Sequence, residues 1–386
     1  MNAFVMTQQQ AAKGEEALQE GKENRKSRKK IILNTLLFFA VFGLTLYGVF
    51  HGEDIGDINE AIHQSKIQWL LPAIICVLVF IWGESIIIWY MMRSCGIHLK
   101  ERLCFLVSSV GFFFSCVTPS ATGGQPMQIY FMKKEKIPIP VSTVILMIVT
   151  IIYKLVLVAI GLGIVLFARG FLNTYLGDVL FIFYLGLGLN IFCVTFMMIL
   201  VFHPFLAKRI MTLGHTILEK LHLLRKKEGR LAKLEASMDM YNDTAAYIRQ
   251  HPMLMLNVFL ITFGQRIALF AVTYFVYRAF SLTGTPMITL ITLQAVIAVS
   301  VDMLPLPGGM GISETLFLII FAPVFGELLL PGMVLSRGLG YYSELLISAL
   351  FTLVAVVVFG HRERAARAHA AVPNLSEDEE ICKKVG

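Results

Sequence analysis

Runs of about 20 apolar residues recur along the chain, and they constrain its fold more than any other feature. A helix of that length crosses roughly 30 Å of hydrocarbon, and a helix satisfies its own backbone polar groups there. Of 386 residues, 56% are hydrophobic and 15% charged, whereas a β-barrel would show short alternating segments. The sequence therefore predicts an all-α polytopic membrane protein with about eight transmembrane helices, broken or re-entrant segments included.

The apolar runs divide the chain into a membrane domain, a central loop and two tails. We predict a disordered basic tail at 1–30, a transmembrane domain at 31–360 and a second tail at 361–386. Loop 203–252 would separate halves 31–202 and 253–360, either as a helix on the cytoplasmic membrane face or as a solvated linker. Uninterrupted spans are predicted at 31–50, 69–92, 141–168, 177–202, 253–280 and 333–360.

The basic residues flank the apolar runs, and their distribution predicts the orientation. The tail ending in "RKSRKK", the loops at 93–102 and 132–138, and the segment "LLRKKEGR" are basic, whereas loop 51–68 is acidic. Because basic loops stay in the cytoplasm, both termini are predicted to be cytoplasmic. The net charge of +7 then suggests contact with anionic membrane lipids rather than with nucleic acid.

Two apolar regions are interrupted by proline and glycine, at 103–132 and at 286–330. The first has basic ends, Arg102 and Lys133, so we expect a re-entrant hairpin that returns to the cytoplasmic side. The second is either a hairpin from the outside or two short spans, which charge does not distinguish. The interrupting residues are Pro119, Gly123, Gly124 and Gln125 in "TPSATGGQ", and Pro305, Pro307, Gly308 and Gly309 in "LPLPGG".

Both interruptions lie between two long apolar runs, so the pattern helix, break, helix occurs twice. By the charge-based orientation, the leading helix 69–92 runs from outside to inside and 253–280 runs the opposite way. Interrupted helices at matching places in two inverted halves are typical of transporters with a substrate site at the membrane midplane. We therefore predict an inverted repeat.

Seven ionisable residues fall within the predicted membrane segments, where charges are costly and commonly functional. They either form buried ion pairs that hold helices together or bind a substrate. In the second case the bases would contact a lipid phosphate and the acids a cationic headgroup, and the helix start at Ile312 would also suit a phosphate. The candidate binding residues are Lys154, Arg266, Arg337, Glu84, Asp302, Glu314 and Glu344, with the adjacent Tyr153 and Gln265.

The sequence contains no recognisable catalytic motif, such as HExxH, a Walker A loop or GxSxG. Six cysteines are scattered without metal-ligand spacing and are predicted to be small buried hydrophobes. We accordingly assign no catalytic residues, no metal and no cofactor, and we expect a conduit rather than an enzyme.

Several stretches resemble the transmembrane, flippase-like domain of the lysylphosphatidylglycerol synthase/flippase family. They are "TPSATGGQPMQIYFMKKEKIPI", "VTIIYKLVLVAIG", "LPLPGGMGISETLF" and "SRGLGYYSELL", and the likeness covers roughly 30–360. The resemblance implies a multi-pass protein of the bacterial cytoplasmic membrane that moves, or helps to make, aminoacylated phospholipid. In larger members this chemistry lowers negative surface charge and confers resistance to cationic peptides, and relatives are linked to glycolipid synthesis.

One departure from the family concerns lysyl transfer, which its members perform with a soluble C-terminal domain. This chain continues only about 25 residues past its last predicted span, so we expect that domain to be absent. The predicted function is translocation of a phospholipid such as lysylphosphatidylglycerol, with a homo-oligomer or a separate synthase as potential partners. The alternatives are a membrane-embedded phosphatidylglycerol lysyltransferase or lipid-linked transferase component, and a small-solute transporter.

Overall fold

The computed structural model describes residue 60 and residues 62–118, 121–202 and 230–370. The predicted span at 31–50, the tail at 1–30, Pro119, and most of the C-terminal tail lie outside the described residues. The described part is helical, without strands. This confirms the all-α fold class.

Five helical runs in the described part are long and apolar enough to cross a membrane. Prolines stand in the first turns of α6 and α11, where a missing N–H costs nothing. The first four runs agree with the predicted spans to within a few residues, whereas the last begins at Ala322, well before the predicted 333, and is interrupted by a π-helical turn at Gly338–Tyr342. They are α3 (Ile67–Ser94), α6 (Ile139–Phe167), α8 (Leu180–Phe202), α11 (Pro252–Ala279), and a run from Ala322 that includes α14 (Ala322–Phe325), α15 (Leu329–Arg337) and α16 (Ser343–Ala370).

The first interrupted region forms a helical hairpin of α4 (Glu101–Val117) and α5 (Gly124–Lys134). At 1.5 Å per residue the two helices are about 26 and 17 Å long, less than the roughly 30 Å of a full crossing. Thr118 Oγ1 donates to the Phe114 carbonyl (2.6 Å) and accepts from the Gly123 N–H (2.9 Å). The threonine thus satisfies backbone groups that the break would otherwise leave unpaired.

The second interrupted region also forms a pair of short helices in contact, an arrangement that fits both a hairpin from the outside and two short spans. Its helices, α12 (Met287–Val301) and α13 (Ile312–Ile320), are about 22 and 14 Å long and contact each other. The connection includes a short turn at Pro307–Gly309. Gly308, Gly309 and Gly311 all have positive φ, a conformation that glycine adopts without strain.

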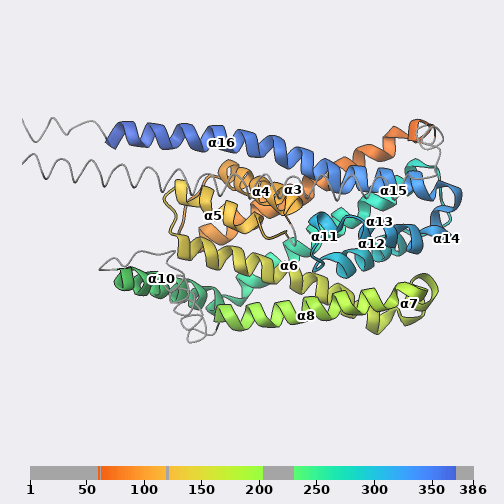
Figure 1. The fold of residues 1–386 in the computed structure, drawn as a ribbon, viewed down its shortest axis with the longest axis horizontal. Coiled ribbons are helices and arrows are strands. Elements are labelled where there is room, and N and C mark those ends of the chain that lie inside the picture. Colours follow the sequence, from red (N-terminus) through yellow and green to blue (C-terminus); the bar gives the residue numbers. More distant parts are fainter. Residues whose placement is uncertain (1–59, 61, 119–120, 203–229, 371–386) are drawn as a thin grey trace, which may run out of the picture.

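The two helix–break–helix units lie in opposite directions (Figure 1). At the start of α3, the Lys66 N–H donates to the Ala279 carbonyl at the end of α11 (2.9 Å), and the two helices pack along each other, so they are antiparallel. The contacts between helices also match across the units. Helix α3 contacts α4 as α11 contacts α12, and α16 contacts α4 as α6 contacts α12, which is the pattern that an inverted repeat produces.

The hairpins enter the bundle from opposite ends and meet at their tips. Helix α4 contacts the 307–309 turn, and Cys116 packs with Met310 and Tyr341 in a small buried cluster. The Tyr341 hydroxyl donates to the Cys116 carbonyl at the end of α4 (3.0 Å). Both backbone breaks are therefore brought to one place in the middle of the protein.

Helices α8 and α10 flank this core, together with the short α7 (Arg169–Tyr175) between α6 and α8. Helix α8 packs on α6 and α12, and Gly186 allows it to approach the Val299 carbonyl, to which Asn190 Nδ2 also donates (3.3 Å). Helix α10 (Arg230–Gln250) contacts α6, α8 and α11. The predicted loop 203–252 thus contains a helix packed on the bundle, while residues 203–229 lie outside the described part.

We expect Gly124→Ala to destabilise the first hairpin. A Cβ at Gly124 would lie 2.1 Å from Ser115 Oγ and 2.7 Å from the Gly111 carbonyl oxygen, so α5 would have to move away from α4. Overpacking of this kind costs about 1–3 kcal/mol, measurable as a lower thermal unfolding midpoint in detergent. Gly188→Ala on α8, where a Cβ meets nothing within 4 Å, is the control, and an equal loss in both variants would contradict the packing argument.

Candidate functional site

The ionisable residues of the membrane segments occupy a layer between two large apolar clusters. One cluster contains Met91, Ile152 and Val258, and the other contains Leu157 and Phe270. Between them four of the helices contribute polar side chains. These side chains are Glu84 on α3, Tyr153 and Lys154 on α6, Gln265 and Arg266 on α11, and Glu344 at the start of α16.

Lys154 forms an ion pair with Asp302, whose backbone ends α12. The Lys154 Nζ to Asp302 Oδ2 distance is 2.7 Å, and the two side chains are only 11% and 10% exposed. Tyr153 donates its hydroxyl proton to the other carboxylate oxygen. Asp302 thus joins the second break to α6, and its negative charge is compensated inside the protein.

A second ion pair joins Glu314 and Arg337 across the same break. Arg337 Nε donates to Glu314 Oε1 (2.7 Å) and its NH2 group to the Gly308 carbonyl (3.3 Å). Glu314 Oε2 accepts the Gly311 N–H (2.7 Å), so the carboxylate caps the positive N-terminal end of α13. The helix start at Ile312 is confirmed, and in this conformation the protein's own carboxylate occupies the position where we predicted a phosphate.

Arg266 differs from the other two bases because no carboxylate of the described residues lies within ion-pair distance of it. Its guanidinium stacks on the ring of Tyr153, 3.9 Å from the centroid, and on Phe80 at 4.7 Å. Its Nε is buried without a hydrogen-bond partner. Beside it, Gln265 Nε2 donates to the Phe80 carbonyl (2.7 Å). The cation–π contacts stabilise the Arg266 charge only in part, so its guanidinium can still bind an anion.

Two carboxylates of the layer, Glu84 and Glu344, form no ion pair within 4 Å with any described residue. Glu344 is 9% exposed. Both interact electrostatically with Arg266, and Glu344 also interacts with Arg337 and with Glu84. The charges of the layer that lie outside the two ion pairs are therefore one guanidinium and two carboxyl groups, held near one another by α3, α11 and α16.

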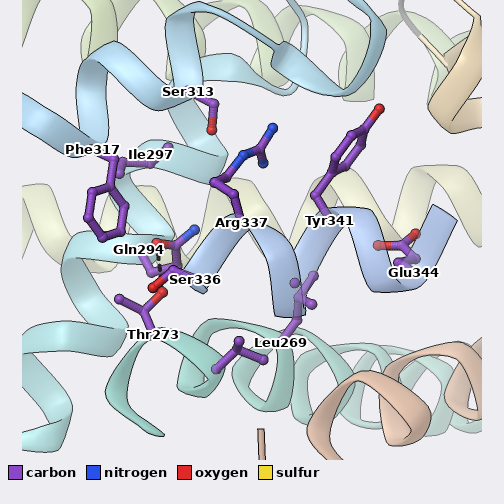
Figure 2. Close-up of a pocket in the computed structure, with 12 residues that line it drawn as sticks. Leu269, Thr273, Gln294, Ile297, Ser313, Phe317, Ser336, Arg337, Tyr341 and Glu344 are labelled. Atoms are coloured by element: carbon purple, nitrogen blue, oxygen red, sulfur yellow. Dashed lines mark hydrogen bonds between the residues drawn. The ribbon is translucent and has the colours of Figure 1, made fainter. Parts of the chain in front are cut away.

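A cavity of about 120 Å³ borders this layer. Figure 2 shows Arg337, Tyr341 and Glu344 along one helical ribbon, with Ser336, Gln294 and Thr273 gathered beside it. The Ser336 hydroxyl is buried and has no hydrogen-bond partner. A cavity of this size and polarity holds several water molecules, but it is smaller than the 300–1,000 Å³ typical of ligand pockets.

Tyr341 connects the parts of the site, although sequence reasoning did not select it. Besides its bond to Cys116, its ring stacks under the Arg337 guanidinium at 4.7 Å. A Cβ on Gly308 would lie 2.2 Å from that ring, so the glycine allows the turn to touch it. The sequence signal that could have identified Tyr341 was its position in the motif "SRGLGYYSELL". The cavity residues Thr273, Gln294, Ser313 and Ser336 were missed as well.

The structure brings the predicted ionisable residues together, and it gives the two glycine doublets different functions. Gly308 and Gly309 adopt positive φ, whereas Gly123 and Gly124 have helical geometry or begin a helix and allow close packing. Gln125 does not join the charged layer, since its amide donates to Thr150 and to the Leu146 carbonyl on α6. Pro305 is exposed in the turn. The described residues contain no cluster suited to a metal ion.

Comparison with known proteins gives one result for nearly the whole membrane domain. The family model described as "Lysylphosphatidylglycerol synthase TM region" matches residues 31–369. A comparison with curated proteins finds no match. The matched range includes both hairpins and every residue of the charged layer.

We expect Lys154→Met to lower stability by about 3–5 kcal/mol, because it leaves the buried Asp302 carboxylate uncompensated. The double variant Lys154→Met/Asp302→Leu should recover most of that loss, since it removes both charges. Thermal unfolding of the purified variants in detergent measures the effect. Arg362→Met is the matched control: it breaks the Arg362–Glu135 pair, where the arginine side chain is 49% exposed, and should cost less than about 1 kcal/mol. A double variant no more stable than the single one would refute the pairing argument.

Proposed function

The chain belongs to the family of lysylphosphatidylglycerol synthase transmembrane regions, and from that premise we propose that it moves a phospholipid headgroup across the membrane. The substrate that fits best is an aminoacylated phospholipid such as lysylphosphatidylglycerol, whose headgroup carries both ammonium and phosphate charges. The acyl chains would remain in the bilayer while the headgroup passes through the polar layer.

The observation that carries this proposal is the meeting of two hairpins, entering from opposite ends, beside a charged layer. The hairpin helices are too short to cross a bilayer, so we place them as re-entrant segments. Transporters of lipids and solutes place their binding sites at such midplane breaks, between oppositely oriented halves. We propose that a polar headgroup reaches the layer from either side along the hairpins.

Each charged residue has a role in this proposal. Arg266 would bind the lipid phosphate first, because no carboxylate among the described residues pairs with it. Lys154 and Arg337 would join it by exchanging Asp302 and Glu314 for the phosphate. Glu344, which lines the cavity, and Glu84 would face the ammonium group. Bidentate pairing of guanidinium with phosphate favours arginine for the first contact.

The small cavity indicates that the described conformation is closed. Since about 120 Å³ accommodates waters rather than a lipid headgroup, transport would require the hairpin tips to separate. The contact between Tyr341 and Cys116 lies where this separation would occur. We propose that the two hairpins open in turn, so that the layer faces one side of the membrane at a time.

The cellular setting follows from the charge distribution. The family match supports a multi-pass membrane protein, and we propose that it resides in the bacterial cytoplasmic membrane with both termini in the cytoplasm, the side that the basic loops favour. A separate synthase would supply the lipid, and a second copy of the chain is a further potential partner.

We expect Arg266→Gln to reduce lipid movement by about 10- to 100-fold, the loss that removing a charged hydrogen-bond partner of 1.5–3 kcal/mol implies. The measurement is transbilayer movement of lysylphosphatidylglycerol in liposomes containing the purified protein. Arg278→Gln is the matched control. Arg278 also lies on α11 and stacks on an aromatic ring, Trp69 at 5.0 Å, but at the helix end and away from the layer.

Two further assays separate the rival functions. Formation of lysylphosphatidylglycerol from lysyl-tRNA and phosphatidylglycerol by the purified chain would identify a transferase and count against the proposal. Uptake of free amino acids that depends on Arg266, with lipid movement unaffected, would identify a small-solute transporter. Equal lipid movement in correctly folded wild type and Arg266→Gln would remove the assignment of the site.

A further inference from the structure

The charged layer contains one more acid than base. Its bases are Lys154, Arg266 and Arg337, and its acids are Glu84, Asp302, Glu314 and Glu344, so three positive and four negative charges would leave a net charge of −1. The two ion pairs neutralise Lys154 with Asp302 and Arg337 with Glu314. Arg266 is left to balance both Glu84 and Glu344.

Among the described residues, no further base forms an ion pair with either of these two carboxyl groups. Glu84 interacts with Arg266 and Gln265 on α11. The groups that interact with Glu344 come from all the elements around it: Arg266 on α11, Arg337 on α15, Glu84 on α3, Tyr153 on α6, Cys116 on α4 and Tyr341 in the π-helical turn. Arg337 is already bonded to Glu314, so its charge is shared.

An uncompensated charge in such a site is expensive, and a carboxyl group in this position holds a proton instead. Two carboxyl groups near a single cation resist ionising together for the same reason. We propose that, without bound lipid, the layer holds one exchangeable proton on the Glu84–Glu344 pair, and that a cationic lipid headgroup displaces it. This inference rests on the proposed function and adds a second transported species to it.

The cavity gives the proton a route. Glu344 lines it together with Ser313, Ser336, Thr273 and Gln294 (Figure 2). Ser336 is 6% exposed and its hydroxyl has no partner, so it is available to a water molecule. A cavity with room for several waters and a carboxyl group at one end has the composition of a proton relay.

The exchange balances in charge and atoms. The carboxyl O–H bond breaks, its electron pair stays on the oxygen, and the proton passes to a water in the cavity. The ammonium group of the headgroup then takes the proton's place beside the carboxylate. A purely anionic lipid offers no cation for this step, so it leaves the proton in place. Movement of the cationic lipid in one direction is thereby coupled to a proton in the other.

Infrared spectroscopy of the lipid-free protein at neutral pH tests the proton itself. We expect the C=O stretch of a protonated carboxyl group in the wild type. It should disappear in Glu344→Gln and in Glu84→Gln, because either change leaves one carboxylate for Arg266. Glu327→Gln, at an exposed position in the short 3-10 turn Gly326–Leu328, should keep the band. Its absence from the wild type, or its survival in both layer variants, would overturn the inference, and the second variant covers a folding failure of the first.

Proton release on lipid addition tests the exchange. Lysylphosphatidylglycerol added to the protein in weakly buffered detergent should release about one proton per chain, as the charge count requires, and phosphatidylglycerol should release none. Binding and movement of the cationic lipid without proton release would overturn the coupling while the proposed function stands. A protonated carboxyl band in a protein that neither binds nor moves lipid would instead remove the proposed function.

Discussion

The contact between the Tyr341 hydroxyl and the Cys116 carbonyl is the interaction on which the centre of this protein depends. A helix that ends in hydrocarbon leaves backbone groups without partners, at a cost of several kcal/mol each. The chain interrupts its helices at two points within the membrane domain, and it places the two interruptions against each other. Tyr341, from the π-helical turn, serves both breaks: its ring packs on Gly308 in the second break, and its hydroxyl donates to the buried Cys116 carbonyl near the end of α4.

Ion pairs extend this principle from the backbone to the side chains. Asp302 and Glu314 lie at the two sides of the second break, and each bonds to a base on a neighbouring helix. Breaking either pair would leave a buried charge, so the pairs fix the positions of α12 and α13 relative to α6 and α15. Arg266 is stabilised differently, by two aromatic faces, and this is what keeps it available to an anion.

The helices and both breaks could be predicted from the sequence because they follow from local properties. Apolar length determines the spans, and "TPSATGG" and "LPLPGG" mark the interruptions. The pairing within the charged layer could not be predicted, since it depends on which helices become neighbours. Lys154, for example, pairs with Asp302, which is 148 residues away in the sequence. The π-helical turn at 338–342 was also missed, because the apolar pattern continues through it. Tyr341 was overlooked for a related reason, since nothing local distinguishes it from Tyr342.

Glu314 gives the start of α13 an unusual property. Because the carboxylate already takes the Gly311 N–H and the Arg337 guanidinium, the lipid phosphate of the proposed function would meet a position that another anion already fills. Phosphate binding at this position would exchange one anion for another. Its net affinity would be the difference between the binding free energies of the phosphate and of the Glu314 carboxylate. Under the proposed function, such an exchange would bind the phosphate weakly and release it readily, which favours rapid turnover over tight retention.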